Sequence, residues 1–423
     1  MTSHRLFYFI ILVFFFELGI NPKEIKAGYL GFVSGTVTDE RNFPLQYIKV
    51  IINGAETETD RYGKFRLQNI PTPYDVTIAD KNTSTAVIYE NINIDNPELI
   101  LFGAVIDKNL NAAFINVKFP EIPQKSTAIL KFISQDEFSS RLIEAFSGDN
   151  NKTIPVYWPQ TKSSISGKII FIQKDTYEYE SFIEKNITVS KSNIPVKTNL
   201  KSGNSVNPKT SSIIVNSPDK NYTAKSVNVY ADFMDFSENS EILLYSDEGK
   251  LNSVKCIIPE LFPFSGKYKV KSNVQFKNGS GYETNNFVKP NDKVSIQNES
   301  PPEPQTPTDN FLGANGNTEF YYSLGSGTGV YIVQFKSVNT KLNFYIVTKE
   351  RSTRLNYLSR DEFRRSGSVE FRWRVNKYLT YFSVDDFVKP SVFKNDIGYK
   401  AILYSQERTF KTIGLLLIIL SFK

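Results

Sequence analysis

The sequence predicts an all-β protein made of tandem antiparallel β-sandwich domains, Ig-like or prealbumin-like, that follow an N-terminal signal peptide. Its 423 residues include 33 Phe and 23 Tyr but only 2 Met, a composition that suits pleated, half-buried sheets. Short runs that alternate apolar and polar residues recur about every 8–12 residues, with turn residues between them. The length exceeds the ~100–200 residues of one ordinary domain, so several domains are expected.

Residues 1–27 are predicted to be a secretory signal peptide. A short polar, basic lead ends at Arg5, the apolar run Leu6–Phe16 follows, and a small residue, Ala27, stands near the expected cleavage site. The run is shorter than the ~20 apolar residues that span a bilayer. The chain has a single cysteine, so no internal disulfide forms. Export without disulfides favours a bacterial periplasmic, outer-membrane-associated or extracellular protein.

The first domain is predicted over 29–103. Val33–Asp39 and Gln46–Ile52 alternate as strands do, and the second run stops at Asn53-Gly54, a strong turn pair. A second turn is expected at Asp60–Gly63, where the glycine is free to adopt a positive φ.

A family resemblance covers residues 29–102. The segments that carry it are Val33–Asp39, Phe43–Leu45, Tyr47–Ile52, Thr59–Leu67 and Ile70-Pro71. In this order they resemble the carboxypeptidase regulatory-like (transthyretin-like) domain. The resemblance implies a mostly non-catalytic β-sandwich that accompanies enzymes, transporters and surface proteins. The zinc ligands of the neighbouring carboxypeptidase have no counterpart here, so no catalytic residue is transferred.

Three further sandwiches are expected after the first, and they resemble Ig-like or fibronectin-III-like domains only weakly. Ser368–Val375 is similar to a late fibronectin-III strand, and Phe138–Phe146 is predicted to be a short helix or a loop with one helical turn. The predicted divisions are a β-sandwich over 104–194, an Ig-like sandwich over 195–299, a Pro-rich linker over 300–310 and an Ig- or fibronectin-III-like sandwich over 311–423.

The apolar run Ile413–Leu420 near the end of the last domain has two readings. It is either a buried terminal strand or a tail that interacts with a membrane or directs sorting, and it is too short to span a bilayer.

Most catalytic chemistry is excluded by composition. Without the signal peptide, which holds His4, the chain has no histidine, and Cys256 is its one cysteine. Ser-His-Asp and Cys-His catalysis, His-based zinc sites and C-x-x-C redox chemistry therefore do not apply. Gly325–Gly329 joins two strand-like runs and predicts a hairpin loop, not a phosphate-binding loop. We predict no catalytic residue, no cofactor and no metal.

Two weaker alternatives involve a substrate or a bound metal ion. Paired carboxylates hydrolyse glycosides without histidine, so a carboxylate-dependent glycoside hydrolase stays open. The densest acidic cluster is Asp232, Asp235, Glu238 and Glu241, which we interpret as a solvated loop with a Ca²⁺ site as its alternative.

Aromatic residues supply the candidate ligand-binding positions. Aromatic faces on a sandwich stack against sugar rings, although such residues more often pack in cores. The candidates are Trp158, Trp373, Tyr321 and Tyr322.

Charge argues against nucleic acid as a partner. The net charge of +6 comes from 50 basic and 44 acidic residues that are interspersed along the chain, without the basic face that nucleic acid needs. The sequence therefore predicts an exported, non-catalytic cell-envelope or surface protein with a structural or adhesive role, whose partner is an envelope protein or a glycan. A carbohydrate-binding accessory protein is the first alternative, and the oligomeric state is open.

Overall fold

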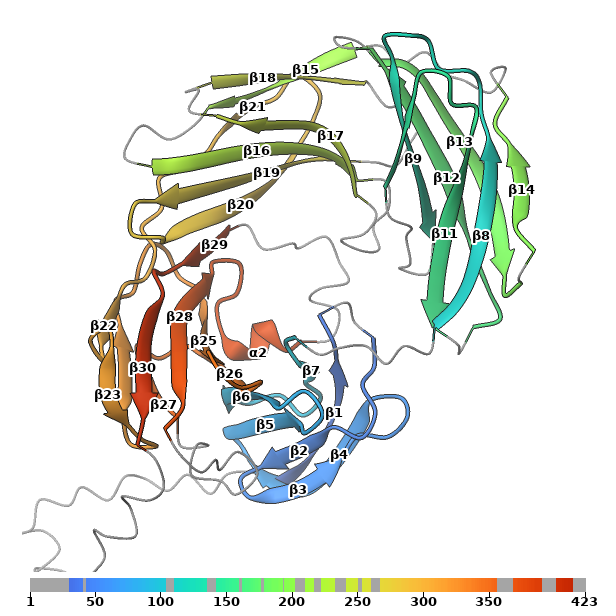
Figure 1. Cartoon of the computed structure of the whole chain (residues 1–423). Helices are drawn as coiled ribbons and strands as arrows, with labels where there is room; N and C mark the ends of the chain where they lie inside the picture. Colours follow the sequence, from blue (N-terminus) through green and yellow to red (C-terminus); the bar gives the residue numbers. More distant parts are fainter. Residues whose placement is uncertain are drawn as a thin grey trace, which may run out of the picture.

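The computed structural model is all-β, as predicted (Figure 1). Among the described residues the only helix is the single turn α2 (Val384–Phe387), and no helix there is long and apolar enough to cross a bilayer. The predicted signal peptide, and the apolar tail beyond Ile413, lie outside the described residues. The structure describes residues 30–40, 43–103, 110–134, 142–159, 162–175, 179–192, 194–201, 210–216, 222–232, 241–249, 253–259, 267–355, 368–389 and 401–413.

Unit 1, residues 30–103, is a sandwich around Val33, Val50, Phe65 and Tyr89, all buried. Its predicted turns are confirmed. Gly63 has φ +72°, and a side chain there would meet the carbonyl of Val37. The strands are β1 (Leu30–Thr38), β2 (Lys49–Ile52), β3 (Ala55–Glu58), β4 (Lys64–Pro71), β5 (Tyr74–Asp80), β6 (Thr85–Ile92) and β7 (Glu98–Ile100).

Unit 2, residues 110–201, packs two sheets, ordered β11-β8-β14 and β10-β9-β12-β13. The helix predicted over Phe138–Phe146 is wrong where it is described: Ile143–Phe146 is strand β10, paired with β9 and burying Ala145. Pairing with β9 buries one face of Ile143–Phe146, and this tertiary contact overrides the weak helical pattern of the segment. The strands are β8 (Leu110–Lys118), β9 (Thr127–Ser134), β10, β11 (Asn151–Pro159), β12 (Ser164–Lys174), β13 (Tyr179–Ser190) and β14 (Val196–Asn199).

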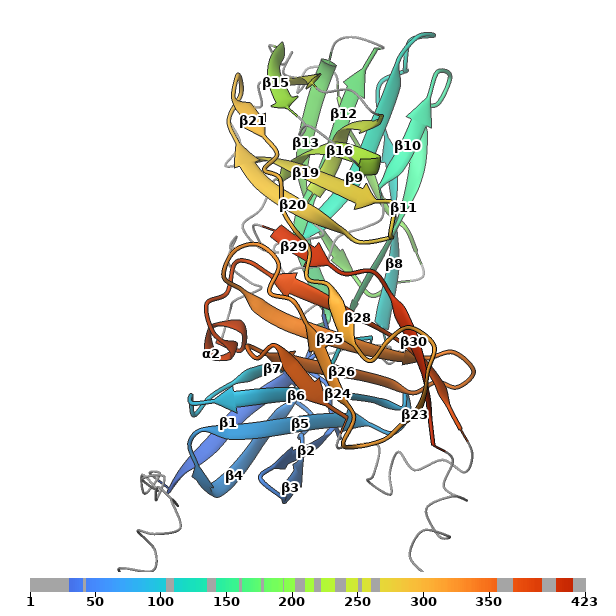
Figure 2. The ribbon, with the colours of Figure 1, turned by 90° about the vertical axis from the view of Figure 1, so that its left-hand side faces the viewer.

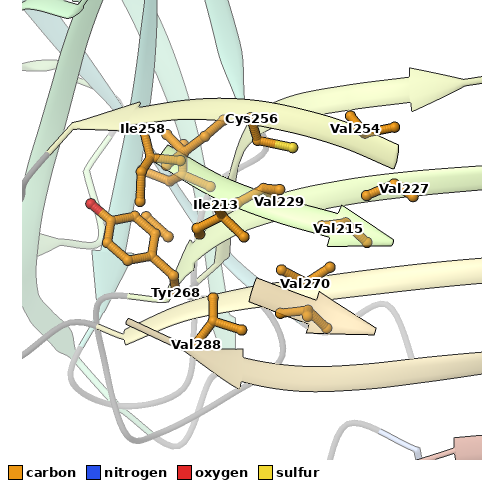
Figure 3. Packing of buried hydrophobic residues seen from close by; sticks show 14 of the residues in the cluster. Ile213, Val215, Val227, Val229, Val254, Cys256, Ile258, Tyr268, Val270 and Val288 are labelled. Carbon is orange, nitrogen blue, oxygen red and sulfur yellow. The ribbon is translucent and has the colours of Figure 1, made fainter. Parts of the chain in front are cut away.

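Unit 3, residues 210–296, has a core of β-branched side chains with Cys256 and Tyr268 among them (Figure 3). Alternate residues of β16 (Tyr222–Asp232) and β19 (Lys267–Phe276) point into it, as the period of a strand requires. The remaining strands are β15 (Thr210–Asn216), β17 (Glu241–Glu248), β18 (Ser253–Pro259), β20 (Gly281–Val288) and β21 (Lys293–Ser295).

Unit 4, residues 304–413, begins inside the segment predicted to be a linker. Pro304–Thr306 is strand β22, and the main chain of Glu303 exchanges hydrogen bonds of 2.9 Å with Ser323. The structure therefore differs from an unpaired spacer here. The other strands are β23 (Phe311–Ala314), β24 (Glu319–Tyr322), β25 (Val330–Ser337), β26 (Asn343–Thr348), β27 (Ser352–Arg354), β28 (Glu370–Tyr378), β29 (Ala401–Tyr404) and β30 (Arg408–Thr412).

Units 1, 3 and 4 share one 14-stranded sheet. Unit 1 joins unit 4 where β6 and β26 run parallel, with Thr85–Tyr89 opposite Asn343–Val347. Unit 4 joins unit 3 where β29 lies antiparallel to β20, with Ala401–Tyr404 opposite Gly281–Thr284. Main-chain hydrogen bonds thus cross both joins, and neighbouring units cannot turn relative to each other without breaking a ladder.

Unit 2 joins unit 3 by side chains instead. One face of β9 and β12 carries Ile129, Ile133, Ile170 and Ile172, which belong to the same buried cluster as the core of unit 3. The other face of these strands packs within unit 2, around Trp158 and other buried residues. Both faces of the β9–β12 pair are therefore covered.

The described chain starts and ends at one end of the molecule (Figures 1 and 2). β1 begins and β30 finishes at the end formed by units 1 and 4, whereas units 2 and 3 lie at the opposite end. The sheet β11-β8-β14 is the layer of unit 2 farther from unit 3.

Candidate functional surfaces

The polar chemistry of the described residues offers little for catalysis. In these ranges no group of three or more His, Cys, Asp or Glu side chains is placed to hold a metal ion. Cys256 is buried in unit 3, where burial and the nearby Asp247 raise the pKa of its thiol to about 12. A thiol with that pKa is neutral at physiological pH and therefore a poor nucleophile.

Within the predicted acidic cluster, the Glu241 carboxylate binds lysines and does not form a calcium site. Asp235 and Glu238 lie outside the described residues. Glu241 is buried and accepts from Lys269 at 2.6 Å and from Lys271 at 2.7 Å. Lysine ammonium groups occupy the oxygens that a cation would need, so the carboxylate serves an ion pair.

Two lysines donate hydrogen bonds to main-chain carbonyls in and beside the glycine-rich loop Gly325–Gly329. Lys377, which is 1% exposed, donates to the carbonyls of Leu324 at 2.8 Å, Ser326 at 2.9 Å and Gly327 at 2.5 Å. Lys349 donates to the Gly329 carbonyl at 3.0 Å. Burial, with Lys349 nearby, lowers the pKa of Lys377 to about 8. The loop links β24 to β25, which lie in different sheets, so the predicted hairpin is wrong. It is a structural connection whose carbonyls accept hydrogen bonds from both lysine amino groups.

Two carboxyl groups bear on the glycosidase alternative. Burial raises the pKa of Glu90, as a general acid requires, but Glu90 lies near the join of units 1 and 4 and hydrogen-bonds to Thr348 and Thr353. Asp309 lies in a shallow polar pocket beside Arg408, and the Thr409 amide, at 2.8 Å, lowers the pKa of that carboxyl. Neither environment combines an open cleft with a protonated acid and a second carboxylate.

Three of the four predicted stacking aromatics are wrong as ligand-binding residues. Trp158 and Tyr322 are fully buried, and each donates to a carbonyl, of Lys162 and Glu350, at 2.8 Å. Trp373 is fully buried in unit 4, with its ring 5.2 Å from that of Phe320. Large aromatic surfaces stabilise these cores, so no face is left for a sugar.

Tyr321 is the exception, at 38% exposed. It lies on the small sheet β22-β24-β27, opposite Thr306 and Ser352, and none of the other exposed aromatic residues belongs to those strands as described.

A pair of exposed aromatic residues lies where the sequence analysis did not place one. Phe114 on β8 is 42% exposed and Tyr157 on β11 is 52% exposed. Strand pairing sets Pro155 opposite Phe114 and Ala112 opposite Tyr157, so both rings share one face of the sheet β11-β8-β14. Successive residues of a strand face opposite sides, so the alternation of Tyr157 and Trp158 could have predicted that one of the two is exposed. The pairing with Phe114 could not be predicted, because it depends on register.

The same face continues into polar residues, and we call the whole the outer face of unit 2. Thr153 donates to Oδ1 of Asn116 at 2.8 Å, and the next row ends at Lys118. On β14, Lys197 lies opposite Asn116, and Asn199 lies opposite Lys118. The face is made of Ala112, Phe114, Asn116, Lys118, Asn151, Thr153, Pro155, Tyr157, Lys197 and Asn199.

Comparisons with known proteins add little. No family model and no curated protein sequence match this chain. It is similar to the TIE protein of Bacillus anthracis at 9% identity, over 63% of this chain but only 50% of that one, with a TM-score of 0.16. A putative adhesin of Bacteroides ovatus is 11% identical over 46% of this chain and 94% of its own, at 0.17. The major pilin subunit of Bacillus cereus is 13% identical over 63% and 99%, at 0.14. At such TM-scores these likenesses carry no argument about function.

Proposed function

We propose that this chain is an exported, non-catalytic protein of the bacterial cell surface whose role is structural or adhesive. The observation that supports this most is the shared sheet, which joins units 1, 3 and 4 by main-chain ladders. An enzyme gains from a cleft and a polar constellation, whereas a scaffold gains from units that keep a fixed relative position. For its domains we propose units 1 to 4, which keep the predicted order of four sandwiches but assign β14 to unit 2 and β22 to unit 4.

We infer that residues 29–102 act as an accessory domain of the carboxypeptidase regulatory-like kind. The turn at Asp60 is in keeping with that resemblance. Its Oδ1 accepts from the Tyr62 amide at 2.8 Å and the Lys64 amide at 2.9 Å. In this chain the domain contributes β6 to the shared sheet, so its role is to extend the scaffold.

The arrangement also suggests how a surface protein of this shape is used. The described chain begins and ends at the same end, and unit 2 lies at the far end with its outer face directed away from unit 3 (Figures 1 and 2). We infer that unit 2 displays this outer face for contacts with a partner.

The second candidate is a carbohydrate-binding accessory protein. The burial of Trp158, Trp373 and Tyr322 leaves Tyr321 as the one exposed residue of the four candidates, and the outer face of unit 2 is the surface that favours this function. The two functions are compatible, because a displayed scaffold adheres through such a face.

The test combines location with shape. Cells that produce the protein with an epitope tag in unit 2 are treated with protease, and the purified protein is measured by small-angle X-ray scattering. We expect surface cleavage and a scattering curve that fits one rigid particle. A protein protected inside the cell, or a curve that needs freely moving units, would contradict the proposal. Turnover of any glycan or peptide would also contradict it.

A further inference from the structure

We propose that the outer face of unit 2 binds an acidic polysaccharide. The proposal rests on the proposed surface role and adds to it the chemical class of the ligand. It depends on one observation, the gradient across this face from exposed aromatic rings to hydroxyl and amide groups to lysines, with no carboxylate among its ten residues.

The aromatic end supplies the stacking surface. Phe114 and Tyr157 lie on neighbouring strands, with the ring of Pro155 directly opposite Phe114. The two rings and Pro155 form a small exposed apolar area on an otherwise polar face, which a ligand with an apolar side would cover. The apolar C–H face of a pyranose ring covers an aromatic ring well.

The middle row supplies polar groups that orient a ligand. The hydrogen bond from Thr153 uses Oδ1 of Asn116, which leaves the Nδ2 amide of Asn116 and the lone pairs of the Thr153 hydroxyl for a partner. Sugar hydroxyl groups donate and accept at once, so they fit a paired amide and hydroxyl. A hydrophobic peptide would leave both groups buried without partners, at a cost.

The lysine end sets the charge of the ligand. Lys118 and Lys197 are exposed on this face. Asp149, two residues from Asn151, is held by Lys152 at 2.8 Å. Glu121, three residues after Lys118, lies beyond the paired rows of this face. From Phe114 to Lys118 the strand covers roughly 13 Å at ~3.3 Å per residue, room for a short oligosaccharide. A chain that stacks at one end therefore places a carboxylate near the lysines at the other.

The experiment measures binding of hexamannuronate, a linear uronic acid, to the full chain without its signal peptide by calorimetry. Mannohexaose, the same sugar without carboxylates, is the matched probe. We expect hexamannuronate to bind, mannohexaose to bind at least about tenfold more weakly, and the difference to shrink at 0.5 M salt, where screening acts within ~4 Å.

Variants separate the two ends of the face. Tyr157→Ala and Phe114→Ala should each weaken binding of hexamannuronate about tenfold. Lys118→Gln with Lys197→Gln should remove the preference for the acidic sugar. Tyr47→Ala, at an exposed tyrosine of unit 1, and Lys336→Gln, at an exposed lysine of unit 4, are controls that should bind as the parent does.

Three results would overturn the proposal: no binding of hexamannuronate, equal binding of both sugars by the parent chain, or unchanged binding by the Phe114→Ala/Tyr157→Ala double variant. Each is distinguishable from failure of the scaffold function, which is measured by protease accessibility and scattering without any sugar.

Discussion

The hydroxyl of Tyr179 in unit 2 donates to the carbonyl of Leu244 in unit 3 at 3.0 Å. Leu244 is in β17, the last strand of the shared sheet. Lys174 approaches the same carbonyl at 3.4 Å, and Lys131 donates to the carbonyl of Glu241 at 2.5 Å. An open sheet edge invites pairing with another chain, and here side chains of unit 2 cover carbonyls of that edge. Unit 2 thus ends the sheet.

Removing the Tyr179 hydroxyl should loosen this contact slightly. Tyr179→Phe is expected to lower the free energy of unfolding by about 1 kcal/mol, because Lys174 still approaches the carbonyl. Urea denaturation measures this. Tyr157→Phe, at an exposed tyrosine of the same unit, is the control and should change stability by less than ~0.5 kcal/mol. Equal effects of the two changes would contradict the role given to Tyr179.

Removing the charge of Glu241 should be more severe. Glu241→Gln leaves Lys269 buried without its counter-ion, and we expect a loss of about 3 kcal/mol. Glu184→Gln, in the partly exposed pair with Lys168 at 3.2 Å, should cost ~1 kcal/mol or less. The double change Glu241→Leu/Lys269→Leu should recover most of the stability. A double variant as unstable as Glu241→Gln would show that the ion pair is not the cause.

Lys377 should make stability depend on pH in the alkaline range. Its pKa is about 8 in the folded chain and 10.5 when unfolded, so between these values the unfolded state binds more protons. Stability therefore rises with pH across this window, by up to about 3 kcal/mol, as the cost of burying the charge disappears. Buried tyrosines with raised pKa act in the opposite sense above pH 10.

The measurement is thermal unfolding at pH 7.5 to 10.5 of the parent and of Lys377→Met. The difference between them should shift in favour of the parent as the pH rises. A difference that stays constant across the window would mean that Lys377 does not titrate there.

Cys256 should be inert to thiol reagents in the folded protein. It is fully buried, and the pKa of its thiol is raised to about 12. We expect no labelling by Ellman's reagent at pH 8 and rapid labelling in denaturant, so the labelling rate reports the opening of unit 3. Rapid labelling of the native protein would contradict the packing shown in Figure 3.

The sequence predicts the parts of the fold that local rules control. Alternation locates most strands, and Asn53-Gly54 is a turn with both φ values positive. Burial on both faces of β12 is readable in Ile169–Ile172, an unbroken apolar run. The joins of unit 4 to units 1 and 3 are not readable, because they consist of main-chain hydrogen bonds that leave no side-chain signature. The prediction of Trp158 as a ligand-binding residue was wrong for a related reason. Which of Tyr157 and Trp158 faces inward depends on the sheet that packs against them.

The central claim is that the joins between units are as firm as the units themselves. Hydrogen exchange of backbone amides tests it most directly, at Asn343–Val347 beside β6 and at Ala401–Tyr404 beside β20. We predict protection equal to that of β16 and β19 in the core of unit 3, since one sheet opens as one body. Exchange at the joins that is much faster than in those strands would show separate units that move independently, and would contradict the account.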